Sequence, residues 1–571
     1  MRLLSAQVNF EVQSQTGGRW VTDGICRREE EARQLCEKLI QKVEGVRIVR
    51  NYTAREGEYP VETVIHTETR EVRKKPLQVV AIEQANYCQT SEEFLGPDSR
   101  GTITRLLRQY LEDKSLTASE LLHNPGEMKR FSNYESLLPS AVSRVAGLQS
   151  KSTGEDSKVR RDAIYAHIDE LRVKAEKALA GKDLPYPKET GWGAAMTKLE
   201  QQVGGDAKEA EYLGRVVLCR DLVNIRNLLG KVEWVLQLCS DTNANQRHIA
   251  MLDGVIADVV GSPQVVIDLL GRQFDLASAL LRLLDVMQGD YTPLPREQAP
   301  EVTKLLSEFI ASGNAPETSA VLMDFLVRQV RGSQKLGGND PESNQIAFSK
   351  LLDRLFRNGI VWGGTRMAEA LVVGFLRFVE QGGTEGRRVA LDGVLGMLPW
   401  SSDRVGFMCQ LGGTDLVKND LDFFIGKLEA QFTGAGGINA MIDPKVPLKP
   451  KLQAIASLYL TVANADLPAE PRDKLADKID TAVSEFIAAQ RIIEKLDDPT
   501  ASLRMRAIRL ISFASNDVLS SPKARKMVRN QILGYLRQPN FDQKFIEGLV
   551  PEEQALALRN FYDLLGKAQF I

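Results

Sequence analysis

Residues 276–287, Leu-Ala-Ser-Ala-Leu-Leu-Arg-Leu-Leu-Asp-Val-Met, decide how most of this chain folds. Only Ser278, Arg282 and Asp285 in this stretch are polar, so a helix over these residues is apolar on nearly every side. Such a helix is stable in water only where other elements of the protein cover it. The stretch therefore predicts a core helix inside a packed array of helices.

Helical patterns extend outward from this stretch over most of the chain. From about Gly101 onward, apolar residues recur three and four positions apart, which is the spacing of one helix face. Residues 474–495 carry a single apolar stripe, which includes Leu475, Ile479 and Val483, between charged residues, and so predict a half-exposed helix. Enclosed and half-exposed helices together are what stacked helical layers produce, so we expect an all-α region here.

Internal similarity indicates that parts of this helical region are repeated. Residues 251–256, MLDGVI, match residues 390–395, ALDGVL, at an offset of 139 residues, and each copy leads into an apolar helix and a proline-containing loop. A shorter similarity relates residues 304–313 to 350–359 at an offset of 46. Periods of about 45 residues are typical of two-helix solenoid units such as HEAT repeats. We therefore expect a HEAT-like, internally duplicated helical repeat; chance similarity between leucine-rich helices is the alternative.

The N-terminal residues follow a different pattern, because apolar and polar residues alternate along residues 4–13, which predicts a strand. The elements expected after it are a strand at 20–26, a helix at 29–43, and strands at 46–53 and 61–69. The order strand, strand, helix, strand, strand predicts a small antiparallel sheet on which one helix packs. Residues 77–82 are either a fifth strand or part of an exposed linker.

The fold class is therefore α+β, with a small sheet domain ahead of a long helical region. A chain of 571 residues is long enough for three or more domains. The expected division is a ββαββ module at 1–90, a helical connector with flexible linkers at 91–190, a first helical unit at 191–385, and a second at 386–571 that carries a basic C-terminal segment.

Charge and cysteine usage exclude several classes of protein. The 73 basic and 75 acidic residues give a net charge of -2, which offers no global reason to bind nucleic acid or an anionic membrane. No run reaches the roughly 18 apolar residues that a membrane-spanning helix needs. The six cysteines form no CxxC pair, which disfavours a disulfide framework and a thiolate zinc site. We expect a cytoplasmic protein.

Motifs that carry chemistry are missing from the sequence. It contains neither a P-loop nor a GxSxG nucleophile motif. The four histidines, His66, His123, His167 and His248, are too dispersed to indicate a triad or a metal site. The sequence therefore assigns no catalytic residue, no cofactor and no metal ligand.

One local charge asymmetry points to a partner. Residues 501–540 contain eight basic residues against Asp517 alone, and a buried stripe at intervals of four leaves Arg525, Lys526 and Arg529 on other faces of the helix. We expect these three residues to bind an acidic protein surface, with a solvated helix face as the alternative.

These observations predict a non-enzymatic adaptor, scaffold or regulatory protein, whose helical repeat and N-terminal module bind protein partners. An enzyme with carboxylates and arginines in a cleft between helices is the main alternative, because residues from distant helices leave no local spacing signal. A pocket ringed by ionisable side chains would favour that enzyme. Nucleic-acid binding through the basic segment is less favoured, since aromatic residues are sparse there.

Overall fold

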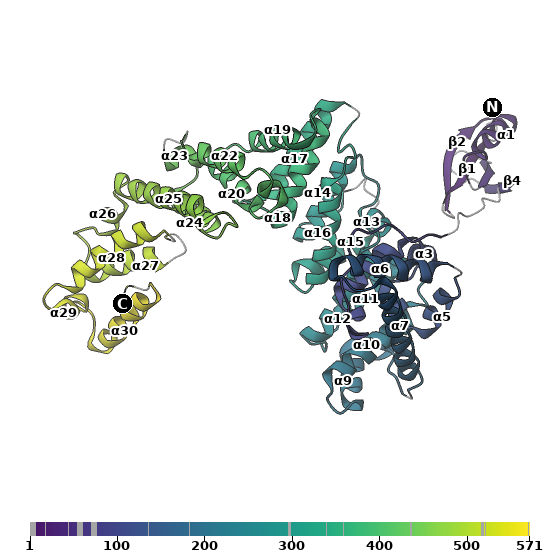
Figure 1. Cartoon of the computed structure of the whole chain (residues 1–571), viewed down its shortest axis with the longest axis horizontal. Helices are drawn as coiled ribbons and strands as arrows, with labels where there is room; N and C mark the ends of the chain where they lie inside the picture. The colour runs from purple at the N-terminus through teal and green to yellow at the C-terminus, as the bar shows by residue number, and fades with distance from the viewer. Residues whose placement is uncertain are drawn as a thin grey trace, which may run out of the picture. The chain divides into compact units, whose positions relative to one another are not determined.

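The structure is a computed structural model, which confirms an α+β fold with a small antiparallel sheet ahead of an all-helical region (Figure 1). Its contacts divide the chain into two compact units, Met1–Gln78 and Val79–Ile571. The residues that it describes are 7–16, 19–43, 45–53, 61–69, 77–134, 136–181, 183–294, 299–338, 340–357, 359–433, 437–515, 519, 521–568 and 570.

The N-terminal unit is the predicted ββαββ module. Its elements are β1 Gln7–Thr16, β2 Arg19–Cys26, α1 Glu29–Leu39, β3 Gly45–Thr53 and β4 Val61–Thr69. The strands are antiparallel in the order β2-β1-β3-β4, and Val12 of β1 lies opposite Ile48 of β3. These two side chains and Val46 are buried together with Ala32 and Cys36 of α1. The alternation of apolar residues therefore places one face of the sheet under the helix.

The fifth strand that residues 77–82 could have added is not formed. These residues have no strand structure, and the Val80 N–H donates to the Leu106 carbonyl at 2.9 Å instead. The backbone of Val80 is therefore tied to a helix of the second unit, and β1 to β4 complete the sheet in the described part of the chain.

The second unit is built almost entirely of helices. The first of them are α2 Pro97–Leu106, α3 Arg108–Lys114, α4 Ala118–His123, α5 Pro125–Ser132, α6 Leu137–Thr153, α7 Ser157–Leu179, α8 Pro187–Thr190, α9 Trp192–Gln202, α10 Ala207–Leu222, α11 Leu228–Cys239, α12 Gln246–Val260, α13 Pro263–Leu270, α14 Leu276–Gln288, α15 Glu301–Ala311 and α16 Pro316–Arg331. The others are α17 Pro341–Leu355, α18 Gly364–Phe375, α19 Gly383–Met397, α20 Ser401–Leu411, α21 Asp415–Lys418, α22 Leu421–Thr433, α23 Ile438–Met441, α24 Leu448–Ala463, α25 Ala469–Ala489, α26 Ile492–Leu496, α27 Leu503–Ser515, α28 Pro522–Leu536, α29 Phe541–Phe545 and α30 Pro551–Lys567. The short elements are the 3-10 turns η1 Glu92–Leu95 and η2 Leu376–Phe378 and the paired strands β5 Phe356–Arg357 and β6 Ile360–Val361.

The two kinds of helix predicted from apolar patterning are confirmed. On α14, Leu280, Leu283 and Leu284 are buried in the main core cluster, and the helix packs against α15 and α17. On α25, Leu475, Ile479 and Val483 form one buried stripe. Burial of these stripes against neighbouring helices holds the array together.

Helices of the second unit pack in a succession along the chain. The contacts run from α12 to α16, α18, α20, α24, α25 and α28, and each helix packs on the one before it. Helices α16, α18, α20 and α24 begin 48, 37 and 47 residues apart. Neighbour-to-neighbour packing at this spacing is consistent with a helical repeat.

The two sequence similarities differ in their structural setting. Helices α15 and α17, in which the two stretches of the shorter similarity begin, both pack on α14. In the longer similarity, Gly254 on α12 lies against Arg100, whereas Gly393 on α19 lies against the ring of Phe375. Because these surroundings differ, the duplication at the longer offset stays a prediction.

The predicted domain boundaries inside the helical region also stay predictions. Residues 149–157, which are rich in serine, glycine and charge, were expected to be one of the flexible linkers of the connector at 91–190, but Gln149 is buried in α6 and accepts a hydrogen bond from Arg160 Nε at 2.6 Å. None of the described helices is by itself long and apolar enough to cross a membrane; α12 and α13 meet that test only as a pair bent by 94°.

Candidate functional site

A cleft of about 650 Å³ lies between α2, α12, α16 and α18 of the second unit. Helices α2 and α16 both pack on α12, and α18 packs on α16. The cleft volume falls within the range of about 300–1,000 Å³ that is typical of small-molecule sites. The ionisable side chains that line the cleft are Asp98, Arg100, Arg105, Asp258, Glu317, Asp324, Arg328 and Arg366.

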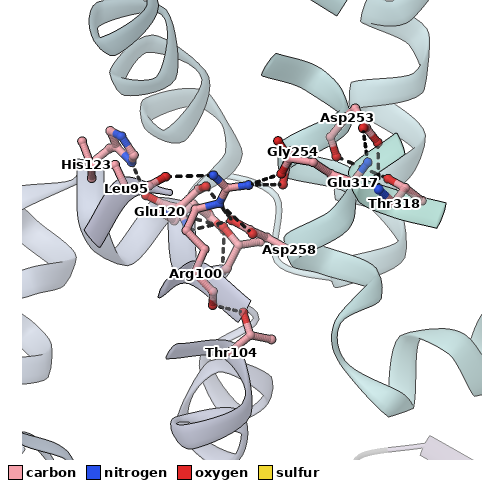
Figure 2. Close-up of polar contacts among 12 residues, drawn as sticks. Leu95, Arg100, Thr104, Glu120, His123, Asp253, Gly254, Asp258, Glu317 and Thr318 are labelled. Atoms are coloured by element: carbon pink, nitrogen blue, oxygen red, sulfur yellow. Dashed lines mark hydrogen bonds and ion pairs between the residues drawn. The ribbon is translucent and has the colours of Figure 1, made fainter. Parts of the chain in front are cut away.

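Arg100 joins three of these helices through a buried guanidinium group. Its Nε donates to Asp258 Oδ1 at 2.9 Å, its Nη2 to Glu317 Oε2 at 2.6 Å, and its Nη1 to the Leu95 carbonyl at 2.9 Å (Figure 2). The side chain is only 1% exposed. Burial lowers the pKa of Arg100, but the charges of Asp258 and Glu317 outweigh burial and leave that pKa raised. Arg100 therefore remains a cation between two anions.

Asp258 is held from a fourth helix as well. Its Oδ2 accepts a hydrogen bond from the Ser119 N–H at 3.0 Å and another from the Ser119 hydroxyl at 2.5 Å, and Ser119 lies on α4. Both carboxylate oxygens thus receive hydrogen bonds from buried donors. A buried carboxylate is stable only with partners of this kind, so Asp258 holds α2, α4 and α12 together.

Two further α12 residues shape the same region. Asp253 accepts hydrogen bonds from the backbone N–H groups of Glu317 at 2.7 Å and Thr318 at 3.1 Å (Figure 2). These N–H groups lie in the first turn of α16, where they have no acceptor within the helix. Burial raises the pKa of Asp253, and its hydrogen bonds from Thr318 and Glu317 oppose that shift. At Gly254, an added Cβ would lie 3.0 Å from Arg100 Nη2 and 3.2 Å from Glu317 Oε2. A side chain here would crowd the Arg100–Glu317 pair.

A second buried ion pair lies beside this network. Lys231 Nζ on α11 is 2.5 Å from Glu120 Oε1 on α4, and neither side chain is exposed to solvent. The other oxygen of Glu120 accepts the Thr117 N–H at 2.8 Å, which completes the N-terminal capping box of α4. Burial raises the pKa of Glu120, and the charge of Lys231 opposes that shift. The pair connects α11 to α4.

His123, the last residue of α4, is fully buried and uncharged. Its Nδ1 lies 2.8 Å from the Ser119 carbonyl (Figure 2), and its Nε2 is buried without a hydrogen-bond partner in the described part of the chain. Burial, together with the positive charge of Arg215, lowers the pKa of His123 from 6.5 to about 3. The imidazole is therefore part of the core and does not serve as an acid or base near neutral pH.

We expect acid to destabilise the protein through His123. The unfolded chain protonates this histidine below pH 6.5, whereas the folded protein does so only at about 3, so stability falls as the pH drops between these values. The loss is about 1.4 kcal/mol per pH unit. Urea unfolding of the wild type and of His123→Gln between pH 7 and about pH 5 measures it, and the variant should show the shallower dependence. Equal slopes would contradict this assignment.

Arginine side chains dominate the accessible part of the cleft. Arg366 on α18 pairs with Asp324 at 2.6 Å, and Arg105 Nη2 donates to Thr102 Oγ1 at 3.3 Å. Arg328 on α16 is exposed to solvent, yet surrounding protein lowers its pKa by desolvation. The charge of Asp324 opposes this shift, whereas Arg105, Arg366 and Arg108 lower that pKa further. Like charges therefore gather at this end of the cleft.

The chemistry of the cleft follows from these partners. Asp258 and Glu317 are bound to Arg100 and Asp324 to Arg366, so three of its four carboxylates are committed to ion pairs. The arginines provide hydrogen-bond donors and positive charge. No group of three His, Cys, Asp or Glu residues that could hold a metal ion occurs among the residues described. The arrangement is suited to binding an anion.

A smaller, apolar cavity of about 120 Å³ lies between α2, α4, α5, α6 and α7. Its walls include Phe94, Ile103, Leu122, Val142 and Leu171. The buried clusters on its two sides are separate, with Leu122 and Leu171 in one and Val142 in the other. Because almost all of its lining is apolar, this cavity offers no acid–base chemistry.

The three residues singled out in the sequence all lie on α28, far from this cleft in the chain. Lys526 and Arg529 are exposed, but Arg525 is half-buried and its Nη2 donates to the Ala568 carbonyl at 2.7 Å. The stripe of α28 that is buried consists of Ala524, Val528, Ile532 and Tyr535. Arg525 thus fixes the C-terminal residues to α28, and Lys526 and Arg529 remain accessible to a partner.

Sequence reasoning missed the cleft residues, because 158 residues separate Arg100 from Asp258 and 217 separate it from Glu317. The only indication of this site in the sequence was the Asp253-Gly254 pair, which lies within the repeated residues 251–256. Comparison with known proteins gives no match, either to a protein-family model, to a curated protein or to a solved structure.

Proposed function

We propose that this protein is a non-enzymatic adaptor or regulatory protein of the cytoplasm that binds protein partners through its helical surface. The succession of helices from α12 to α28 carries the proposal. Stacked helical repeats of this kind form broad binding surfaces. The six cysteines are all free, which supports a reducing compartment.

The proposed contact point for an acidic partner is the exposed face of α28. Two other basic residues of the same segment are already paired, Arg506 with Asp497 and Lys523 with Asp477 at 2.6 Å. Lys526 and Arg529 are exposed and form no ion pair in the described structure. They are therefore available to carboxylates of a partner, at a surface where such pairs set orientation and association rate.

Charge reversal on α28 tests this proposal. We expect the wild-type chain, isolated from its native cells, to retain a stoichiometric protein partner that Lys526→Glu/Arg529→Glu loses. The control is Arg226→Glu/Arg272→Glu, which reverses two exposed arginines outside the segment and should retain the partner. Nuclease treatment distinguishes a protein partner from nucleic acid. Identical captures by all three chains, or loss after nuclease treatment, would refute the proposal.

An enzyme with a site in the cleft is the second candidate, favoured by the ring of ionisable side chains around it. General acid–base catalysis needs a carboxylate that can exchange a proton with substrate. Asp258 and Glu317 instead accept hydrogen bonds from Arg100, and Asp324 is paired with Arg366. The contacts of these carboxylates therefore support binding better than proton transfer.

A further inference from the structure

We propose that the cleft between α2, α12, α16 and α18 binds a small molecule that carries a phosphate group, with Arg105 and Arg328 as its principal ligands. This site is separate from the α28 surface, and the inference does not rest on the proposed adaptor function. Three observations carry it: a group of arginines at one end of the cleft, a volume larger than one phosphate, and a rigid support for the two arginines.

The positive charge gathers at one end of the cleft. Over the whole lining, Arg100, Arg105, Arg328 and Arg366 are matched by four carboxylates, of which Asp258 and Glu317 are bound to the buried Arg100. Around Arg328, however, the charges that act on it come from Arg105, Arg366 and Arg108 against Asp324. A phosphate group carries a charge of about -1.5 to -2 at neutral pH. A bound phosphate would offset the positive charge of the arginines at this end of the cleft.

The guanidinium group also fits phosphate in its geometry. Its planar N–H fork donates two parallel hydrogen bonds to phosphate oxygens, which lysine cannot do. Arg328 has no ion-pair partner in the described structure, and its pKa is lowered both by desolvation from the surrounding protein and by neighbouring arginines. An anion between Arg105 and Arg328 would relieve this repulsion.

The rest of the cleft suits the remainder of such a molecule. Its volume of about 650 Å³ is far more than one phosphate fills, and Ala257, Ala320, Val321 and Met323 give it an apolar wall. Sites for small molecules combine an apolar lining with a few convergent polar groups. We therefore infer an organic phosphate as the ligand.

The two arginines stand on helices that are fixed relative to each other. Arg105 follows Arg100 on α2, and Arg328 lies on α16, whose Glu317 binds Arg100 at 2.6 Å. Asp258 of α12 binds the same guanidinium at 2.9 Å. Because the buried network holds α2, α12 and α16 together, the arginines need little reorganisation on binding, which favours affinity.

Isothermal titration of the full chain with pyrophosphate tests the site. We expect saturable binding, weakened about tenfold by Arg328→Gln and by Arg105→Gln, since each removes charged hydrogen bonds. Arg331→Gln is the matched control, because Arg331 is exposed in the last turn of the same helix and does not line the cleft. It should bind as the wild type does. Citrate, a carboxylate of similar charge, should bind more weakly than pyrophosphate.

The thermal midpoint without ligand separates this role from a structural one. Removing a positive charge from among other arginines should leave the midpoint of Arg328→Gln unchanged or higher. If Arg328→Gln does lose stability, the affinity of Arg105→Gln for pyrophosphate tests the site instead, because Arg105 lies on the other helix. The proposal is overturned if pyrophosphate does not bind at about 10 mM, if both variants bind it as the wild type does, or if citrate binds more tightly.

Discussion

Arg100→Ala should lower the free energy of unfolding by about 3–5 kcal/mol. The substitution leaves Asp258, whose side chain is 4% exposed, as a buried carboxylate without its cation, and it removes the link from α2 to Glu317. An uncompensated buried charge is among the most destabilising changes that a single substitution can make. Urea unfolding, monitored by the helical circular dichroism signal, measures the loss.

Arg105→Ala is the matched control for this prediction. It removes the same side chain from the same helix, but Arg105 is exposed and forms no ion pair in the described structure. Exposed substitutions usually change stability by about 0.5 kcal/mol or less. If Arg100→Ala unfolded as the wild type and Arg105→Ala do, Arg100 would not be the buried link between these helices.

Lys231→Met should cost a similar amount, about 3–5 kcal/mol. It leaves Glu120, which is fully buried, without the cation 2.5 Å away. The same urea titration measures this loss. Because burial raises the pKa of Glu120, the isolated carboxyl group would take up a proton more readily in the folded protein than in the unfolded chain.

The double variant Glu120→Gln/Lys231→Met isolates the interaction of the pair. We expect it to recover most of the stability that Lys231→Met loses, since an uncharged pair leaves no unpaired charge in the core. If the double variant instead lost the sum of the free energies of unfolding that the two single substitutions lose, the two side chains would not depend on each other.

Apolar patterning was sufficient to predict much of the fold. The alternation in residues 4–13, of which residues 4–6 lie outside the described part of the chain, indicated β1, and the nearly all-apolar residues 276–287 indicated the enclosed helix α14. In both cases one local pattern fixes which side chains must avoid water. Residues 77–82 show the limit of such reasoning, because their apolar run resembles a strand, but Val80 bonds to the end of α2.

The candidate site could not be predicted in the same way. Arg100, Asp258 and Glu317 meet only after α2, α12 and α16 have packed, and no spacing within one helix relates them. The local signal for Arg525 was also incomplete, since charge and helical phase could not reveal its bond to the Ala568 carbonyl. Long-range contacts of this kind arise from tertiary packing and leave no periodic trace in the sequence.

The buried ion pairs link the stability of the helical unit to its cleft. Arg100 and Asp258 connect α2 to α12, and Lys231 and Glu120 connect α11 to α4. Helices held in this way keep the accessible arginines of the cleft in place, whereas Lys526 and Arg529 on α28 lie in a different part of the helical succession. The two binding surfaces that we propose therefore lie in separate parts of the helical unit.

Crosslinking mass spectrometry on the complex purified from native cells tests the adaptor function most directly. A carbodiimide, which couples lysine amines to carboxylates in contact with them, reports contacts at Lys526 and at the neighbouring Lys523, both of which are exposed. Our account predicts crosslinks from these lysines to acidic segments of a partner protein. Crosslinks to a partner that involve other lysines but never Lys523 or Lys526 would contradict it.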